Sequence, residues 1–146
     1  MPTMNRFLGV LAVIYILVSG CTVRSSEVTS PNGHIRLAFA LDGNNRMTYQ
    51  VSVGDTVFIA PSLLGFTAKD GVNLAEGFKV INTDFTTHDE TWTQPWGENK
   101  TIRNHYNEMA VHLSDTTNAK LTLRFRIFDD GLGFRYEYEV PGADSI

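Results

Sequence analysis

The sequence predicts an all-β fold, a sandwich of antiparallel strands. Three observations predict it: apolar and polar residues alternate along several segments beyond residue 27, turn-forming residues separate these segments, and this region has no convincing amphipathic helix. The length of 146 residues is enough for one domain. A composition with 42% hydrophobic and 11% aromatic residues is typical of a folded protein rather than of a disordered chain.

The N-terminus has the pattern of a bacterial lipoprotein signal. Arg6 gives a short positive region, and an uninterrupted apolar run follows at residues 7–18. This run is too short to span a bilayer comfortably, which takes about 20 apolar residues. Two small residues then precede Cys21, as in a lipoprotein cleavage box, whose cysteine is acylated. We expect a signal-peptide helix at residues 1–20, lipidation at Cys21 and a tether at residues 21–27; the alternative is an ordinary signal peptide with an incidental cysteine.

Four short strands are expected in the first half of the domain, because apolar residues recur at every second position. Turns are expected at Asp42–Asn45 and at Gly54–Asp55, since Gly and Asn tolerate positive φ. Pro61 is expected to end the third strand. The expected strands are 34–41, 47–53, 57–59 and 62–68, and a turn is expected at 69–71.

In the second half of the domain, the sequence predicts a strand at 78–87, a structured loop at 89–100 that carries both tryptophans, and a strand at 103–113. The last hairpin is the clearest, because its arms at 121–127 and 134–140 both alternate around a Gly-rich turn. The polar face of this hairpin predicts cross-strand ion pairs, which fix register more than they add stability. The residues on this face are Arg124, Arg126, Arg135, Glu137 and Glu139.

Charge and cysteine content exclude several classes of protein. Twelve Lys and Arg against 16 Asp and Glu give a net charge of −4, which argues against binding to nucleic acid. A single cysteine excludes an intramolecular disulfide and a thiolate zinc site.

Acidic residues near aromatic ones are the ingredients of a sugar site. Glycosidases need two carboxylates about 5–10 Å apart across the scissile bond, and single acids in a loop are usually solvated. We therefore expect no catalytic pair within this chain. The acids considered are Asp89, Glu90, Glu98 and Glu108.

Residues 105–108, His-Tyr-Asn-Glu, are all capable of binding a metal ion. In a strand, however, neighbours point to opposite faces, so at most two of these side chains converge. Two ligands are too few for a tight site, and we expect no metal here. The other reading is a polar network that braces the loop with the tryptophans.

Trp92 and Trp96 allow two interpretations. An amphipathic indole can stack on the face of a sugar, or it can plug the end of the sandwich with its N–H bonded to a loop carbonyl. The sequence leaves both open, and we favour the role in the core.

Five blocks of sequence together resemble the N-terminal domain of glycoside hydrolase family 97. They occur in the family's order and at similar spacing, and each block alone is a weak signal. The blocks are SPNG at 30–33, PSLLG at 61–65, ETWTQPWGE at 90–98, IRNHYNE at 102–108 and RFRIFDDGLGFRY at 124–136.

This resemblance implies an exported α-glucosidase or α-galactosidase of the Bacteroidota, which acts on oligosaccharides or polysaccharides. The resemblance also implies three domains in the complete enzyme: an N-terminal β-super-sandwich of the galactose-mutarotase type, a catalytic (β/α)₈ barrel and a C-terminal β domain. Their chemistry depends on calcium, and the catalytic carboxylates and calcium ligands lie beyond the part that this chain resembles. The resemblance thus implies no catalytic residue, metal or cofactor in this chain.

From the resemblance we expect residues 28–146 to be an incomplete super-sandwich that supports the barrel and is inactive by itself. Apolar faces around Phe125 and Tyr136 would be partly uncovered. Residues expected at the barrel-facing rim are Glu98, Arg103, His105, Asn107 and Glu108. We expect an exported protein anchored by lipid in the cell envelope, in the periplasm or at the outer membrane. The alternative is a stand-alone lipoprotein that binds glycans through its tryptophans without catalysis.

Overall fold

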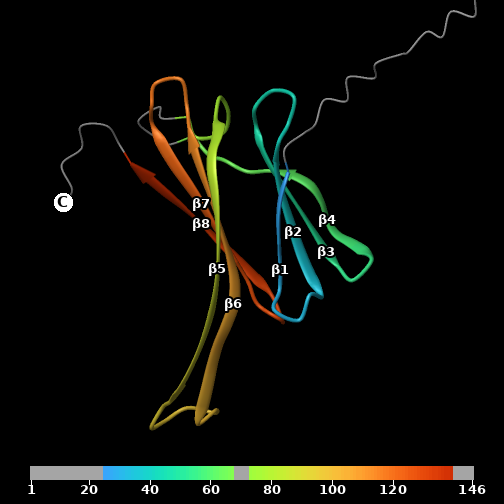
Figure 1. Cartoon of the computed structure of the whole chain (residues 1–146), viewed down its shortest axis with the longest axis vertical. Helices are drawn as coiled ribbons and strands as arrows, with labels where there is room; N and C mark the ends of the chain where they lie inside the picture. The colour runs from blue at the N-terminus through green and yellow to red at the C-terminus, as the bar shows by residue number, and fades with distance from the viewer. Residues whose placement is uncertain (1–24, 68–72, 140–146) are drawn as a thin grey trace, which may run out of the picture.

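The computed structural model describes residues 25–67 and 73–139, and within them eight β-strands form two antiparallel sheets (Figure 1). The first sheet contains β1 (Ser26–Thr29), β2 (Ile35–Leu41), β3 (Met47–Val53) and β4 (Thr56–Leu63). The second contains β5 (Lys79–Thr93), β6 (Thr101–Ser114), β7 (Lys120–Ile127) and β8 (Leu132–Glu139). The predicted all-β sandwich is confirmed. In the described ranges, no helix has the length and apolar character needed to cross a membrane.

The first sheet is a meander in which each strand pairs with the next. Leu37 in β2 lies opposite Val51 in β3, and both are buried because they face the second sheet. In the turn between these strands Asn45 has φ of 56°, and the Asp42 carboxylate accepts hydrogen bonds from two backbone N–H groups at 2.9 Å. The strands expected at 34–41 and 47–53 are confirmed.

Pro61 does not end a strand, and this prediction was wrong. β4 runs through Pro61 to Leu63 because it is an edge strand, where a residue without an N–H costs no ladder hydrogen bond. The register to β3 shifts on both sides of Val51, which marks two bulges. Residues 64–66 are irregular instead of forming the expected strand, and the turn expected at 69–71 lies outside the described residues.

The strand expected at 78–87 is longer, and the predicted loop is shorter. β5 continues to Thr93, so Trp92 lies in a strand opposite Ile102 and the loop covers only 94–100. Residues 88–106, which we call the arm, pair only with each other and extend beyond the sheets (Figure 1). Alternation did not reveal this extension, because both faces of the arm contact solvent. The strand at 103–113 and the hairpin of β7 and β8 are confirmed.

One hydrophobic core lies between the sheets. Phe39 of the first sheet packs against Phe125 of the second with ring centroids 6.1 Å apart, and Phe125 is 0% exposed. The expectation that Phe125 is partly uncovered was therefore wrong, because the first sheet and the ring of Phe134 cover it. Tyr136 is half-buried, and its hydroxyl accepts a hydrogen bond of 2.9 Å from the backbone N–H of Gly65.

Polar contacts connect the sheets on the side of β1. The Asn107 amide donates to the Thr29 carbonyl at 2.9 Å, and the hydroxyls of Ser26 and Thr83 lie 3.3 Å apart. Ser26 and Glu27, which we expected in the tether, belong to β1. The rest of the predicted signal peptide and tether, with Cys21, lies outside the described residues apart from Ser25.

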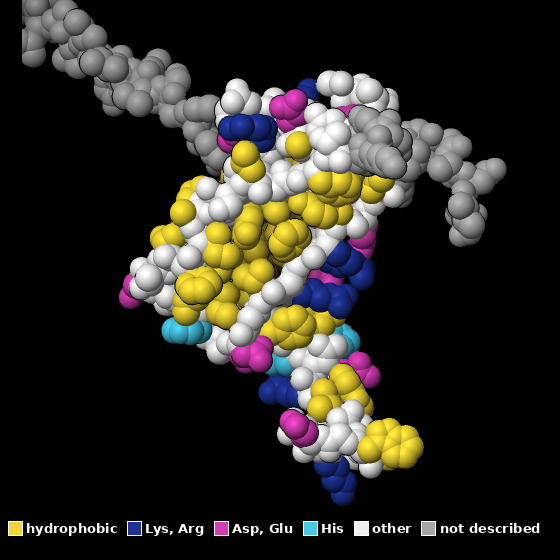
Figure 2. All heavy atoms as spheres, turned by 180° about the vertical axis from the view of Figure 1, so that it is seen from behind, with side chains coloured by type: hydrophobic (Ala, Val, Ile, Leu, Met, Phe, Trp, Pro, Cys, Tyr) yellow, Lys and Arg dark blue, Asp and Glu magenta, His cyan; other side chains and the backbone are white. Residues whose placement is uncertain are grey.

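The opposite side, between β4 and β8, has a different character. Seen from behind, a broad apolar surface lies between the sheets, and Arg and Glu side chains gather beside it on the second sheet (Figure 2). Both β4 and β8 are edge strands. Exposed large apolar side chains on these strands and on the segment after β4 are Val57, Phe58, Leu63, Phe66 and Phe134.

Candidate functional site

The IRNHYNE block lies on β6, which distributes its side chains over two faces. Tyr106 and Glu108 point away from the first sheet, to what we call the outer face, whereas Asn107 points toward the first sheet. This alternation is the one expected from strand geometry.

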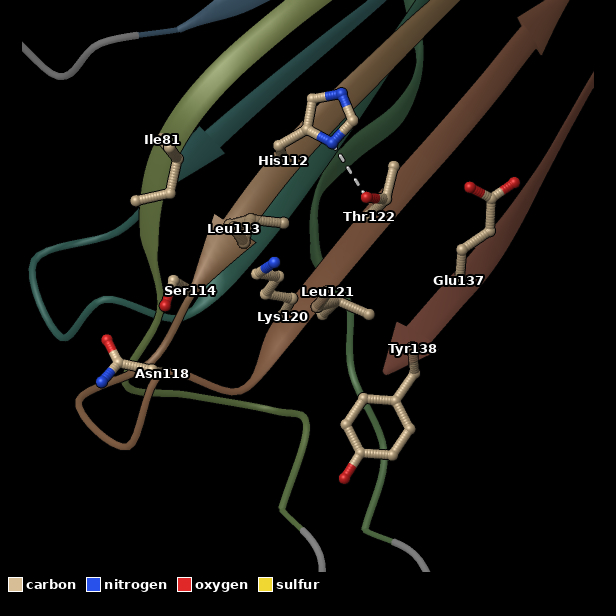
Figure 3. Close-up of a pocket in the computed structure, with 10 residues that line it drawn as sticks. All are labelled: Ile81, His112, Leu113, Ser114, Asn118, Lys120, Leu121, Thr122, Glu137 and Tyr138. Atoms are coloured by element: carbon tan, nitrogen blue, oxygen red, sulfur yellow. Dashed lines mark hydrogen bonds between the residues drawn. The ribbon is translucent and has the colours of Figure 1, made fainter. Parts of the chain in front are cut away.

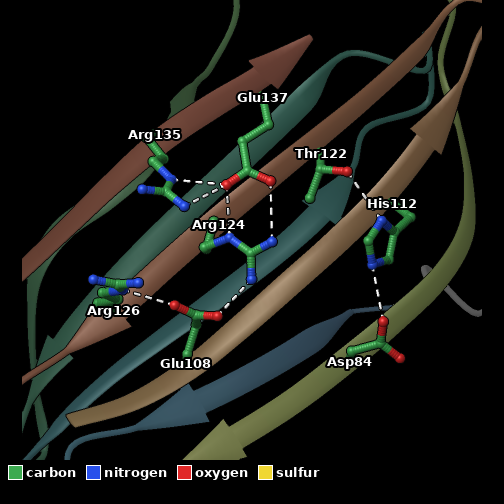
Figure 4. Close-up of polar contacts among 8 residues, drawn as sticks. All are labelled: Asp84, Glu108, His112, Thr122, Arg124, Arg126, Arg135 and Glu137. Atoms are coloured by element: carbon green, nitrogen blue, oxygen red, sulfur yellow. Dashed lines mark hydrogen bonds and ion pairs between the residues drawn. The ribbon is translucent and has the colours of Figure 1, made fainter. Parts of the chain in front are cut away.

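Glu108 is the centre of an ion-pair network on the outer face (Figure 4). The residue is only 7% exposed, and its carboxylate accepts hydrogen bonds from Arg124 Nη1 at 2.5 Å and from Arg126 Nε at 2.7 Å. Arg124 also donates to both oxygens of Glu137, at 2.8 and 3.0 Å. Arg135 donates to Glu137 at 2.8 Å. The network therefore connects β6, β7 and β8.

These contacts favour the charged forms of Glu108, Glu137 and Arg124. Burial alone would raise the pKa of Glu108, but the hydrogen bonds from Arg126 and Arg124 outweigh it and lower the pKa. The hydrogen bond from Arg124 lowers the pKa of Glu137 to about 2. Hydrogen bonds from the Glu137 and Glu108 carboxylates raise the pKa of Arg124. Glu108 is thus an ionised structural partner and not a free acid or base.

Tyr106 connects this network to the base of the arm. The Arg126 guanidinium lies 4.6 Å from the centre of the Tyr106 ring, a cation–π contact. The other contacts of the ring are His88, stacked at 5.0 Å, and Phe128 at 5.2 Å. This supports the interpretation in which a polar network braces the segment with the tryptophans.

A second group of polar side chains lies further along the outer face. His112 contacts the Asp84 carboxylate through Nε2 and the Thr122 hydroxyl through Nδ1, both at 2.9 Å (Figure 4). Carboxylate, imidazole and hydroxyl occur in this order in hydrolytic triads. Here, however, His112 and Thr122 are directly opposite in a regular β-ladder, where such a contact is an ordinary cross-strand pair.

His112 and Thr122 also line a cavity of about 620 Å³ at one end of the second sheet (Figure 3). Its walls mix apolar side chains such as Ile81 with polar ones such as Glu137. In Figure 3 the Tyr138 side chain points away from the His112–Thr122 pair. The polar groups therefore do not converge on one point, as they do in a catalytic site.

The arm presents its aromatic residues to solvent. Trp96 is 84% exposed in the loop at 94–100, and Trp92 is 43% exposed on β5. They do not plug the end of the sandwich, so the interpretation that we favoured from the sequence was wrong. The loop is held by hydrogen bonds from the backbone and side chain of Gln94 to the carbonyls of Lys100 and Asn99, at 3.0 and 2.9 Å.

The remaining predicted rim residues lie along the arm. Arg103 donates two hydrogen bonds to the Asp89 carboxylate, at 2.8 and 2.7 Å, and these lower the pKa of Asp89. His105 is opposite Asp89 on β6, and Glu98 is exposed in the loop. The structure thus places Glu98, Arg103 and His105 on the arm, with Asn107 and Glu108 just beyond its base.

Within 25–67 and 73–139, no group of three or more His, Cys, Asp or Glu side chains is placed to hold an ion. The Glu108 carboxylate, the most buried of the acids considered, is already bound by two arginines.

The pairing of Glu108 with Arg124 and Arg126 is the contact that sequence reasoning missed. The hairpin of β7 and β8 has a short turn that specifies its register, and its polar face was identified. The register of β6 against β7 places Glu108 opposite Arg126. A loop of five residues connects β6 to β7. The sequence of this loop does not indicate which residues of the two strands lie opposite each other.

Comparison with known proteins identifies similar sequences and folds. The family model described as glycosyl-hydrolase 97 N-terminal matches residues 28–145. A retaining α-galactosidase from Bacteroides thetaiotaomicron is 23% identical over 133 residues, which cover 91% of this chain and 19% of the relative. The chain therefore spans about a fifth of the length of this relative.

Solved structures of similar fold include an enzyme of the same family. A glycoside hydrolase family 97 enzyme from Pseudoalteromonas sp. strain K8, solved with panose and with acarbose, superposes with a TM-score of 0.73 and 30% identity. The match covers 80% of this chain and 18% of that enzyme. A β-arabinopyranosidase matches with a TM-score of 0.72 at 23% identity, which indicates a shared fold.

Proposed function

The chain belongs to glycoside hydrolase family 97, as its N-terminal domain, and on this premise we propose that it is the non-catalytic β-sandwich of an exported glycosidase. The enzyme would act on α-linked gluco- or galacto-oligosaccharides. Support for this substrate class comes from relatives named as a retaining α-galactosidase and as an enzyme solved with panose.

We propose that the arm contacts the catalytic barrel of the complete enzyme near its active-site mouth. A two-stranded hairpin alone is at best marginally stable in water. Trp96 at its tip is 84% exposed. Tryptophan is enriched among the residues that contribute most to binding at protein interfaces, where a partner buries it. The arm also carries one of the sequence blocks that resemble the family, at 90–98, and most of a second, at 102–108. Its exposed tip is the single observation that carries this proposal.

The domain would supply no catalytic group. Asp89 and Glu108 are both engaged by arginines, and neither is placed as an unpaired acid or base. The described residues contain no group of three or more His, Cys, Asp or Glu side chains that could hold calcium, which the family implies. Catalysis and calcium binding are therefore proposed for parts of the enzyme other than the described residues.

Export and lipid anchoring at Cys21 remain part of the proposal. They rest on the apolar run at 7–18 and on the position of the only cysteine. Metabolic labelling with a fatty acid tests them: the label is expected in the membrane-bound chain and is expected to be lost in Cys21→Ser. Labelling that persists in Cys21→Ser would contradict acylation at this residue.

Reconstitution tests the proposed function. The Pseudoalteromonas enzyme is produced without the segment that matches this chain, and panose hydrolysis is measured with and without the purified full chain. Neither part alone is expected to be active, and the mixture is expected to co-purify and to recover hydrolysis. Hydrolysis by the chain alone, or a mixture that neither associates nor reacts, would contradict the proposal.

A matched pair of variants tests the contribution of the arm. Trp96→Ala is expected to weaken association with the catalytic part, whereas Phe58→Ala is expected to leave it unchanged. Phe58 is the suitable control because its side chain is also largely exposed, at 75%, but lies on β4. Equal effects of both substitutions would argue against the arm as the contact site.

The exposure of Trp96 also favours a second candidate, a glycan-binding module without catalysis. A cavity of about 450 Å³ lies beside this ring, and Lys100 and Gln94 are among the polar residues that line it. Calorimetry with panose separates the candidates: binding by the full chain that is lost in Trp96→Ala and kept in Phe58→Ala would favour the module.

A further inference from the structure

The arm leaves the sandwich beside Asn107. This residue pairs with Ile127 in the rung of the β6–β7 ladder nearest the arm, and with Thr87 in β5. Beyond the Thr87–Asn107 rung, the described parts of β5 and β6 pair only with each other (Figure 1). A two-stranded ribbon is strongly twisted and only marginally stable by itself. The direction of the arm therefore depends on the contacts that hold this rung.

The Asn107 side chain connects the rung to the other sheet. Its Nδ2 donates a hydrogen bond of 2.9 Å to the carbonyl oxygen of Thr29, the last residue of β1. Its Oδ1 accepts a hydrogen bond of 2.8 Å from the hydroxyl of Thr87. The second contact orients the amide, because it engages the oxygen and leaves Nδ2 directed at Thr29. One side chain thus connects both strands at the base of the arm to the first sheet.

The carbonyl that accepts this bond lies next to a well-held turn. Ser30, which follows Thr29, is 1% exposed, and its hydroxyl accepts a hydrogen bond of 2.9 Å from the backbone N–H of Ile35. In the same turn the N–H of Asn32 donates at 2.8 Å to the carboxylate of Asp129, which lies between β7 and β8. The turn between β1 and β2 is therefore fixed to the second sheet, at the end from which the arm projects (Figure 1).

A different contact holds the outer face of the base. Tyr106 precedes Asn107 on β6 and points to the opposite face, where its ring contacts Arg126 and Phe128. Two successive residues of β6 thus hold the base from both faces, and only Asn107 of these two contacts the first sheet. A contact site that is held in one direction before binding loses less conformational freedom when a partner binds it.

We propose that Asn107 is a positioning residue, which fixes the direction of the arm relative to the first sheet and so presents Trp96 in the geometry that the catalytic part binds. The inference deepens the proposed function and rests on it for the identity of the partner. Loss of the Asn107 amide would leave β5 and β6 paired with each other. It would free the arm to bend about the Thr87–Asn107 rung.

Time-resolved fluorescence anisotropy of the full chain tests whether Asn107 holds the arm. Trp96→Phe leaves Trp92, which lies on β5 opposite Ile102, as the only tryptophan. In this background the anisotropy is expected to decay with the tumbling of the whole chain. Asn107→Ala is expected to add a faster component, because the arm then moves independently of the sandwich.

Two further variants control this measurement. Asn82→Ala removes another side-chain amide of β5 or β6, one that donates at 2.7 Å to Asp84 of its own strand, and is expected to leave the decay unchanged. Asn107→Asp keeps an acceptor for the Thr87 hydroxyl but has no donor for the Thr29 carbonyl. It is expected to behave like Asn107→Ala. Circular dichroism checks that each variant retains the sandwich.

Association with the catalytic part tests the consequence of a fixed arm. The partner is the Pseudoalteromonas enzyme without the segment that matches this chain, and both tryptophans are present. Asn107→Ala is expected to weaken association about fivefold, since binding must then also restrict the arm. Asn82→Ala is expected to leave association unchanged.

The possible results separate this inference from the proposed function. A faster decay and weaker association in Asn107→Ala, with neither change in Asn82→Ala, support it. An anisotropy decay that Asn107→Ala does not change would overturn it. A faster decay with unchanged association would overturn it as well, because the direction of the arm would then not matter for the contact. A wild-type chain that does not associate contradicts the proposed function instead, and the anisotropy of the chain alone still decides whether Asn107 holds the arm.

Discussion

At the scale of single residues, the outer face depends on carboxylates held by more than one arginine. Glu108 is almost completely buried and has two arginine partners, so its desolvation is offset by two charge-assisted hydrogen bonds. Glu137 has the same number of partners but is 36% exposed. Removal of Glu108 would leave two arginines without their shared partner, which is why its contribution exceeds that of an exposed ion pair.

The lowered pKa of Glu137 predicts that the free energy of unfolding falls in acid. Its pKa is about 2 in the folded chain, below the ordinary value of 4.5, so its contribution is complete above pH 4.5 and is lost as the pH falls toward 2. Glu137→Gln is expected to lower the free energy of unfolding by about 1 kcal/mol near pH 7, a value reduced for solvent exposure, and to have little effect near pH 2. Urea unfolding of both chains over this pH range measures it.

Glu98→Gln is the control for this prediction, because Glu98 is an exposed carboxylate at the tip of the arm. It is expected to leave the free energy of unfolding unchanged at every pH. An equal effect of both substitutions would show that the acid dependence does not come from the network.

At the scale of elements, the segment after β4 is held in place by one glycine. Gly65 has φ of 119°, a conformation that side-chain-bearing residues rarely adopt, and its N–H donates to the Tyr136 hydroxyl. A Cβ at this position would lie 2.4 Å from the Ala75 Cα and 2.6 Å from the Leu74 carbonyl oxygen. The segment therefore packs closely against the backbone of residues 74–75, while the hydrogen bond to Tyr136 connects it to β8.

Gly65→Ala is therefore expected to destabilise the chain by about 2–4 kcal/mol, through backbone strain and the clash together. Gly43→Ala is the matched control, since a Cβ at Gly43 meets nothing within 4 Å. Thermal unfolding followed by circular dichroism compares the two variants. Equal midpoints would mean that the segment rearranges at little cost.

The elements also show how far sequence reasoning extends. Alternation identified β2, β3, β7 and β8 because apolar side chains on one face of each strand lie toward the core and polar side chains on the other face contact solvent, which is the condition under which period two is visible. It did not identify the extended part of β5, where Thr91, Trp92 and Thr93 are all exposed. It also ended β4 at Pro61, since a sequence does not reveal which strand lies at the edge of its sheet.

The site was less predictable than the fold. The family blocks identified Glu108 and Arg103, and strand geometry identified which neighbours share a face. The partners of Glu108 depend on the register of β6 against β7, and the partner of Asn107 is a carbonyl of the other sheet. Contacts of this kind depend on how distant strands pack against each other, and the local sequence gives little information about that packing.

At the scale of the whole molecule, the two sheets share one core and should unfold together. Phe39 and Phe125 come from opposite sheets and pack against each other, and each is at most 1% exposed. Neither sheet buries its apolar face without the other, so loss of packing in one sheet is expected to affect both.

Phe39→Ala and Phe125→Ala are each expected to destabilise the chain by about 3–5 kcal/mol, with a single transition. The double variant is expected to lose less than the sum, because the two rings are in contact. Amide exchange measured separately in β2 and β7 checks this prediction. Protection that disappears in β7 but persists in β2 of Phe125→Ala would contradict the shared core.

The position of the arm has a spectroscopic consequence. Both tryptophans of the chain lie on it, at positions 92 and 96, and none lies in the sandwich. Tryptophan fluorescence therefore reports on the surroundings of the arm. It is expected to change little when the sheets of the sandwich unfold. A blue shift on mixing the chain with another molecule would reveal that the arm has been covered, without any label being attached.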